Sequence, residues 1–199
     1  RGRSAIEWWF VHGRYGSGRD VQHFMATLFR LSLAEKGEAP RGNGFQLLLA
    51  VLDPEATQHR CSTWTDAAVV RTAIEKAKAR DARIDPVVQR ALIAELEASG
   101  PLHPVEVPSA QVEFEAAPLD ARWGSVALAQ TDASFNLRFV EPETGTPVAL
   151  TLEADAGMLD LVLPADAARL GEGYAHRCYP RVRLAGRAGN EDVAGDAWI

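Results

Sequence analysis

The feature that most constrains this fold is a series of short segments in which apolar and polar residues alternate. The chain opens with two of them, Ile6–His12 and Val21–Leu33, on either side of a glycine-rich turn at Gly13–Arg19. A period of two places successive side chains on opposite faces of a β-strand, so this stretch predicts a hairpin. Further strands are predicted at Phe45–Leu52, Val112–Ala116, Trp123–Ala129, Phe135–Val140, Val148–Ala154, Leu159–Leu163, Tyr174–Leu184 and Val193–Ile199.

The pattern changes in the middle of the chain, where two helices are predicted. Thr65 and Asp66 are typical cap residues before a helix over Ala67–Ala82, and Asp85 with Pro86 is a typical start for a second helix that ends at Ser99. About ten strands with turn signals every 8–12 residues or so predict a mainly β antiparallel barrel or sandwich. We therefore expect one domain over residues 1–199, with an α-helical insertion at about residues 66–99.

Composition excludes several classes of function. The formal net charge of −6 argues against a nucleic-acid partner, because no dense basic face offsets phosphate repulsion. No apolar run reaches the length of about 18 residues that would predict a membrane span. Nucleotide-cofactor and zinc motifs are absent from the sequence, so we expect no cofactor and no metal. Cys61 and Cys178 could form a long-range disulfide or remain two free thiols, and this leaves the compartment open.

The stretch IEWWFVHG, from Ile6 to Gly13, is the most unusual in the chain. Trp8 and Trp9 must point to opposite faces of their strand, and Glu7 shares the face of Trp9. Burial among aromatic rings favours the protonated form of a carboxyl group, which could then act as a general acid. Such a role requires the cavity to lie on the Trp9 side. The alternative is a structural ion pair between Glu7 and an arginine: Arg14, Arg30 or Arg181.

Histidines and aromatic residues supply the other candidates. His12 and His23 flank the first hairpin and could approach each other as an acid–base or metal pair, or simply lie at strand ends in solvent. The aromatic residues could form a packed barrel core, or they could line an apolar cavity inside it.

Several motifs resemble those of the AttH-like and carotenoid 1,2-hydratase (hydroxyneurosporene synthase) lipocalin-like superfamily. Residues Glu7–Gly13 are similar to its E-W-W-[YF]-x-x-G opening, and His23–Arg30 is similar to the strand that follows. Its later motifs are an alternating leucine strand, G-x-G-Y, an aromatic-Pro/Ser-Arg strand and V-x-G-x-A-W. In this chain they are matched by Leu159–Leu163, Gly171–Tyr174, Tyr179–Arg181 and Val193–Trp198.

The resemblance implies a lipocalin-like domain that binds an apolar unsaturated small molecule, such as an isoprenoid, a carotenoid or a polyketide. It also implies acid-assisted hydration, isomerisation or cyclisation of that molecule, with a non-catalytic carrier or a structural half-domain as the alternative. The expected catalytic residues are Glu7, His12 and His176. The expected ligand-binding residues are Trp8, Trp9, Phe10, His23, Phe24, Tyr174, Tyr179 and Trp198.

Two departures from the family pattern shape the expected partners. Family members continue beyond the A-W-[MI] motif into D-x-x-W-G and a second lipocalin-like domain, whereas this sequence stops at Ile199. Their segment at the position of the two predicted helices is also shorter. We therefore expect the N-terminal half of a two-domain arrangement, completed by a second such domain or by a homodimer. The resemblance favours a periplasmic or secreted protein over a cytoplasmic one.

Overall fold

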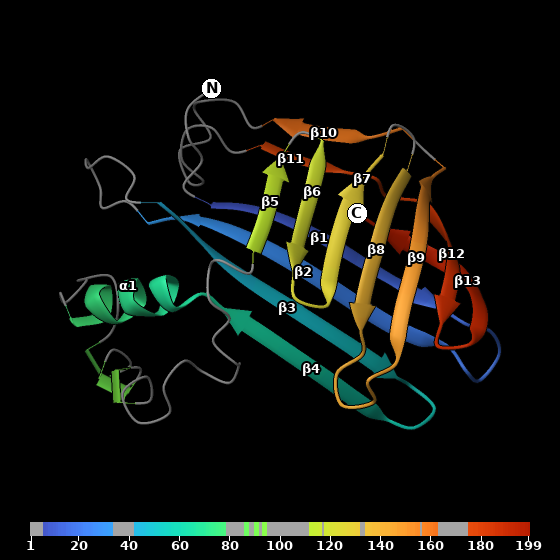
Figure 1. The fold of residues 1–199 in the computed structure, drawn as a ribbon, viewed down its shortest axis with the longest axis horizontal. Coiled ribbons are helices and arrows are strands. Elements are labelled where there is room, and N and C mark those ends of the chain that lie inside the picture. Colours follow the sequence, from blue (N-terminus) through green and yellow to red (C-terminus); the bar gives the residue numbers. More distant parts are fainter. Residues whose placement is uncertain are drawn as a thin grey trace.

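The protein is built around one large antiparallel β-sheet, as a computed structural model shows (Figure 1). The structure describes residues 6–33, 42–78, 86–87, 90–91, 93–94, 112–116, 118–131, 134–155, 157–162 and 175–199. Eleven strands pair in the order β4-β3-β2-β1-β13-β12-β9-β8-β7-β6-β5, and β10 and β11 form a separate two-stranded sheet.

The strands of the first half are β1 (Ile6–Tyr15), β2 (Gln22–Ser32), β3 (Asn43–Asp53), β4 (Gln58–Thr65), β5 (Val112–Ala116) and β6 (Leu119–Trp123). Those of the second half are β7 (Val126–Gln130), β8 (Ser134–Val140), β9 (Pro147–Ala154), β10 (Leu159–Val162), β11 (Ala175–Cys178), β12 (Val182–Ala188) and β13 (Glu191–Trp198).

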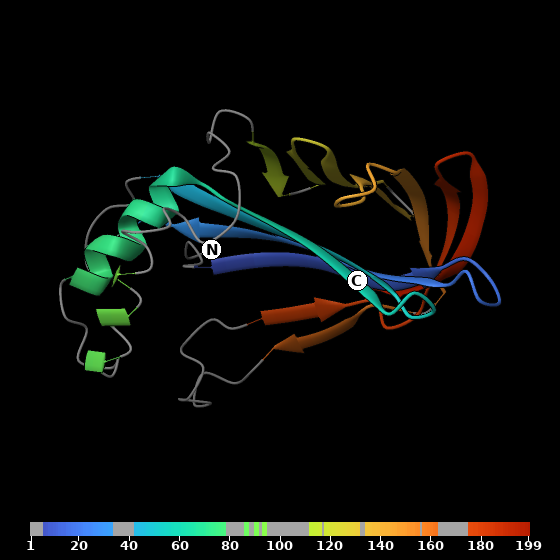
Figure 2. The ribbon, with the colours of Figure 1, turned by 90° about the horizontal axis from the view of Figure 1, so that it is seen from below.

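The large sheet curls so that its two arms face each other, with β1–β4 on one side and β5–β9 on the other (Figures 1 and 2). Rings from the two arms meet between them: Trp9 lies 4.7 Å from Phe114, and Phe24 lies 5.7 Å from Phe139, between ring centroids. Alternate residues of both arms fill this space and are almost fully buried. The fold is therefore mainly β, as the alternation predicted, and its curled sheet is consistent with the lipocalin-like architecture that the resemblance implied.

The small β10–β11 sheet covers the other face of the first arm, below β1 in Figure 2. His176 of β11 stacks on Phe10 of β1, with 6.2 Å between ring centroids and 27° between planes. Strand β1 is thus covered by the curled sheet on one face and, at Phe10, by this hairpin on the other. This is why the strand carries large aromatic residues at consecutive positions.

Four strand predictions need correction. Residues Gln58–Thr65 were not expected to be a strand, but they form β4 at the edge of the sheet. The strand predicted over Trp123–Ala129 is divided between β6 and β7 by a turn at Gly124, whose φ of 57° suits glycine. Tyr174–Leu184 is not one strand, because the chain leaves β11, passes Pro180 and enters β12 in the other sheet.

The fourth correction concerns the first hairpin. Strand β1 runs on to Tyr15, through the start of the predicted turn. Gly13 makes this possible, because a side chain there would press against Ala197 and the Asp196 carbonyl of the neighbouring β13. The glycine therefore allows a close approach of two strands instead of starting the turn.

The helical insertion begins as predicted. Asp66 is buried, and its Oδ1 accepts a hydrogen bond from the Ala68 N–H at 2.8 Å, which caps helix α1 (Ala67–Lys78). The helix lies at one end of β3 and β4 (Figure 1). The described residues 86–87, 90–91 and 93–94 are helical too, at the position of the second predicted helix, and its other residues lie outside the described ranges.

Candidate ligand-binding site

One face of strand β1 carries Trp9 and Glu7, and it points into the space between the arms. Trp9 points between the arms of the large sheet and packs on Phe114. Glu7 shares this face and forms an ion pair with Arg30 of β2, with 2.5 Å between Oε1 and Nη2. The Arg30 guanidinium also lies 5.8 Å from the centroid of the Phe114 ring. On this face, Glu7 has the arginine partner that the structural alternative required.

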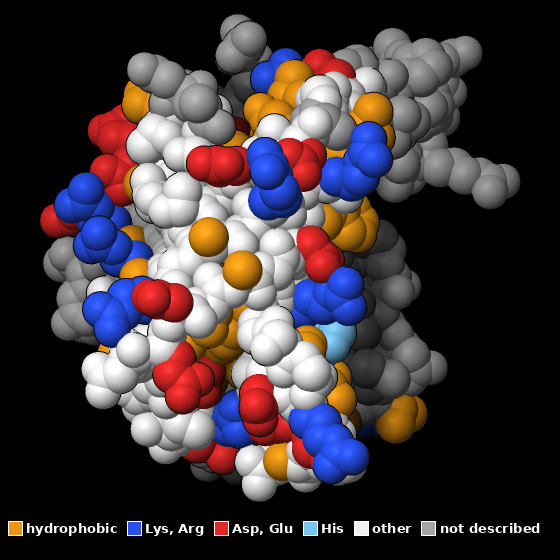
Figure 3. Space-filling model, turned by 90° about the vertical axis from the view of Figure 1, so that its right-hand side faces the viewer, with side chains coloured by type: hydrophobic (Ala, Val, Ile, Leu, Met, Phe, Trp, Pro, Cys, Tyr) orange, Lys and Arg blue, Asp and Glu red, His pale blue; other side chains and the backbone are white. Residues whose placement is uncertain are grey.

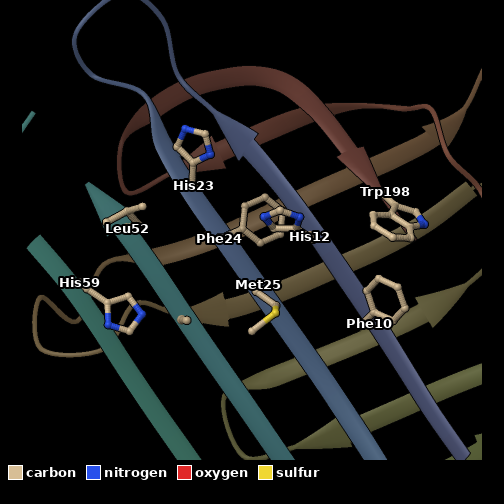
Figure 4. Close-up of a pocket in the computed structure, with 9 residues that line it drawn as sticks. Phe10, His12, His23, Phe24, Met25, Leu52, His59 and Trp198 are labelled. Carbon is tan, nitrogen blue, oxygen red and sulfur yellow. The ribbon is translucent and has the colours of Figure 1, made fainter. Parts of the chain in front are cut away.

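The opposite face of β1 carries a pocket with a volume of about 400 Å³. Strands β1–β4 and the end of β13 supply its lining (Figure 4). The described residues that line it are Phe10, His12, His23, Phe24, Met25, Ala50, Leu52, His59 and Trp198. The strand pairing explains how residues so distant in sequence meet, because Trp198 is the cross-strand partner of His12, and His12 is the partner of Met25.

An aromatic wall forms one side of the pocket. Phe10 meets Trp198 edge to face, with 5.3 Å between ring centroids and 79° between ring planes. The same Phe10 ring stacks on His176 of the β10–β11 hairpin. Met25, Leu52 and Trp198 are exposed by 36%, 41% and 42%, and together they leave apolar surface uncovered at the pocket. An uncovered apolar surface beside a cavity is typical of a binding site.

Three imidazoles lie among these apolar groups, on His12, His23 and His59 (Figure 4). Leu52 pairs with His23 on one side and with His59 on the other, so the three residues form one cross-strand row. None of the described lining residues is a carboxylate, a lysine or an arginine. The described part of the chain also holds no group of three or more His, Cys, Asp or Glu residues that could bind a metal ion.

The pocket brings together five of the eleven residues expected from the sequence. His12, Phe10, His23 and Trp198 line it, and Phe24 borders it although its ring packs on Phe139 between the arms. His176 contacts it through Phe10, and Trp8 lies on the same face of β1 two residues before Phe10.

The remaining expected residues lie elsewhere. Glu7 and Trp9 are on the opposite face of β1, so a chemical role for Glu7 would need a second ligand site between the arms. Tyr179 packs on Phe135, with 5.5 Å between ring centroids, at the edge of the core. Tyr174 lies outside the described residues.

Four lining residues were missed: Met25, Ala50, Leu52 and His59. Met25 was available from the sequence, because it alternates with His23 on the predicted second strand. His59 was not, since Gln58–Thr65 carries mixed polar residues that hide a strand. That segment lies at the edge of the sheet, where one side of the strand is unpaired and polar residues are common.

A buried polar cluster, which no motif indicated, lies at the far end of the two arms. The Tyr15 hydroxyl donates to Glu141 Oε1 at 2.5 Å, and Arg60 Nη2 lies 3.6 Å from Glu141 Oε2. Thr144 donates to the same carboxylate at 3.0 Å, and Arg60 donates to Gln22 at 3.2 Å. Burial and the hydrogen bond to Glu141 raise the pKa of Tyr15, so its phenol stays neutral.

Cys61 and Cys178 are free thiols, which settles the choice left open by the sequence. Acidic and basic side chains alternate over the β12–β13 side of the molecule, as in the ion pair of Arg183 with Asp155 (Figure 3). Within the described residues, no helix has the length and apolar character needed to cross a membrane.

Comparison with known proteins establishes the fold. No protein-family model matches the sequence, and no curated protein matches it by sequence. The chain resembles a crystal structure described as an AttH protein of Nitrosomonas europaea, with a TM-score of 0.55 and 16% sequence identity. The match covers 98% of this chain and 50% of that chain, so this chain spans about half the length of the protein it resembles. The chain has an AttH-like fold.

Proposed function

We propose that the pocket on the outer face of β1–β4 binds a hydrophobic, unsaturated small molecule. The observation that carries the proposal is the combination of a roughly 400 Å³ pocket, an aromatic wall and a few polar groups at one end. Small-molecule sites are typically apolar clefts of about 300–1,000 Å³ in which a few polar groups orient the ligand. The AttH-like fold is compatible with this use, because a curled sheet offers broad faces to a ligand.

Unsaturation is inferred from the aromatic wall. The ring of Phe10 and the indole of Trp198 present π-faces and edges at one place, which suits the flat double bonds of a polyene or a polyketide. The same rings would stabilise a carbocation by about 0.5–1 kcal/mol at this partly exposed wall, and by more where the bound ligand excludes water. Both properties of the wall suit the isoprenoid and polyketide ligands that the sequence motifs imply.

Acid-assisted chemistry is the finer part of the proposal, and His12 is the candidate acid. Its side chain lies among Phe10, Met25 and Trp198, at the middle of the pocket. In a hydration, an imidazolium N–H would transfer its proton to an alkene carbon, and water would add to the cation formed. The added water would then lose one proton to the neutral imidazole, so that alkene and water become an alcohol and the acid is regenerated.

A non-catalytic carrier is the second candidate, and the pocket lining favours it in one respect. A general acid is usually oriented and tuned by a neighbouring group, often a carboxylate. None of the described lining residues is acidic. A carrier would bind the ligand and return it unchanged, whereas a hydratase, isomerase or cyclase would convert it. A second lipocalin-like domain or a homodimer partner stays a prediction in either case.

The methyl groups of the chain's two methionines allow a direct test of ligand binding. Met25 lines the pocket, whereas Met158 lies outside the described lining, and the two are similarly exposed, by 36% and 42%. Protein labelled with ¹³C at the methionine methyl groups should show two signals, assigned with Met25→Ala and Met158→Ala. Titration with farnesol, a C15 isoprenoid alcohol, should shift the Met25 signal and leave the Met158 signal in place.

Two results would contradict the proposal. If neither methyl signal moves with farnesol, or with a polyene such as retinol, the pocket does not bind this class of ligand. If Met158 moves as much as Met25, the binding is unspecific. Binding with no product by mass spectrometry would leave the carrier, and a product that is lost in His12→Gln would establish the chemistry.

A further inference from the structure

We infer that the natural ligand of this pocket is an amphiphile with a single anionic head group, held by His23 and His59, and with an apolar tail on Phe10 and Trp198. This inference rests on the proposed function and names the ligand class more closely. Its basis is the uneven distribution of polar groups along the pocket, which follows from strand pairing.

The pocket has an apolar end and an imidazole end. Phe10 is four residues before Arg14 on β1, and Arg14 is the cross-strand partner of His23. Four residues of an extended strand cover about 13 Å. Across that length, the lining changes from the Phe10–Trp198 wall to the row His23, Leu52 and His59. A linear molecule that lies along β1 would therefore meet rings at one end and imidazoles at the other.

Charge favours an anion at the imidazole end. Histidine is the side chain that most readily gains a proton between pH 5 and 8, and a protonated imidazole donates from both ring nitrogens. Because no described lining residue is a carboxylate, the pocket itself supplies no counter-charge for His23 or His59. A carboxylate or phosphate on the ligand would supply the missing negative charge and accept the hydrogen bonds.

The neighbouring charged groups leave this conclusion intact. Arg14 and Asp196 lie beside His23 on β1 and β13, but they form an ion pair with each other, with 2.9 Å between Nε and Oδ2. Asp53 ends β3 next to Leu52. Hydrogen bonds from the Ala56 N–H and from Gln22 lower its pKa, so its carboxylate stays negatively charged at neutral and mildly acidic pH. On the other two elements, β4 carries Arg60 and Cys61 directly after His59, and β11 carries His176 and Arg177. The Arg177 side chain faces Asp160.

The test compares ligands that share a tail and differ in the head group. Farnesol, farnesoic acid and farnesyl phosphate are titrated into the full chain, with the Met25 methyl signal as the readout. At pH 6 the acid should bind about fivefold more tightly than the alcohol, the effect of one charge pair near water. At pH 8 the two dissociation constants should lie closer together, because histidine as a residue type changes charge between about pH 5 and 8. Farnesyl phosphate, compared with the acid at pH 7, shows which anion the site prefers.

The double variant with His23→Gln and His59→Gln separates binding of the head group by the imidazoles from binding of the tail by the aromatic wall. The readout is the ratio of the dissociation constants for acid and alcohol, and the variant should lose the pH-dependent preference for the acid. Unfolding curves of the variant should match those of the parent, since His59 is exposed and His23 half-buried. Equal affinities for acid and alcohol at both pH values in the parent would overturn this inference and leave the proposed function standing. Absence of binding by all three ligands would overturn the proposed function itself.

Discussion

The Tyr15 hydroxyl donates a hydrogen bond to Glu141 Oε1 at 2.5 Å, which joins the end of β1 to the turn between β8 and β9. Arg60 of the edge strand β4 reaches the same carboxylate, at 3.6 Å. Three segments that are distant in the sheet order therefore meet at one buried carboxylate. This cluster holds the ends of the two arms together where no backbone ladder does so.

Tyr15 should give the protein a specific instability in alkali. An unfolded tyrosine ionises near pH 10, whereas the folded pKa of Tyr15 is raised above that value. Between the two values, the native state binds more protons than the unfolded state. By linkage, the stabilisation is fully present below about pH 10 and is lost progressively as the pH rises above it. Denaturant unfolding at about pH 9, 10 and 11 should therefore show a falling free energy of unfolding.

The control for this prediction is Tyr15→Phe. The variant should be less stable at neutral pH by about 1–3 kcal/mol, because the buried Glu141 carboxylate loses a donor. Its stability should fall less steeply in alkali than that of the parent protein. Tyrosinate absorbance should show one of the three tyrosines ionising only as the chain unfolds. Ionisation of all three in the folded protein would contradict the assigned environment of Tyr15.

Breaking the buried ion pair should cost far more than breaking an exposed one. Glu141→Gln or Arg60→Met leaves one charge buried without its partner, which typically costs about 3–5 kcal/mol. The double variant should cost less than the sum of the two single variants, as measured by urea unfolding. Arg14→Met is the matched control: its ion pair with Asp196 is shorter, at 2.9 Å, but exposed, so the expected loss is within about 1 kcal/mol. Equal losses at the two pairs would contradict the prediction.

Gly195→Ala should weaken the seam between the first and last strands of the chain. A Cβ at Gly195 would collide with the backbone carbonyl oxygen of Arg14 on β1, and a backbone atom cannot turn aside as a side chain can. The expected loss is about 1–3 kcal/mol in the free energy of unfolding. Gly157→Ala is the control, because a Cβ at Gly157 would meet nothing within 4 Å. Calorimetry should show a lower melting temperature for Gly195→Ala alone.

Phe10→Ala should affect the pocket and the small hairpin together. The Phe10 ring contacts Trp198 in the pocket wall and His176 on β11. Loss of the Phe10 ring removes apolar surface that the ligand would cover, so farnesol should bind about tenfold more weakly. Hydrogen exchange should become faster in residues 159–162 and 175–178, since they lose their stacking contact with β1. Leu159→Ala, at an exposed position of the hairpin, should leave farnesol affinity unchanged.

Local signals in the sequence predicted the class of fold and several parts of the site. Alternation identified most strands, Asp66 was recognised as a helix cap, and the double tryptophan placed one indole on each face of its strand. The same alternation placed Glu7 with Trp9, and Phe10 with His12, because a period of two holds wherever the strand lies. Strand β4 and the buried cluster of Tyr15, Arg60 and Glu141 had no comparable local signal.

Only the tertiary structure decided which face of β1 is interior and which is the pocket. Alternation relates residues to one another along a strand, but the direction of the core depends on what packs against each face. Trp198 joins His12 because β13 pairs with β1, and His59 joins His23 because β3 lies between their strands. Such contacts depend on the register between strands that are distant in sequence, and register follows from the packing of the whole sheet. The sequence by itself determined which side chains share a face of a strand. The curl of the sheet determined that His12 lines the pocket while Glu7 faces an arginine.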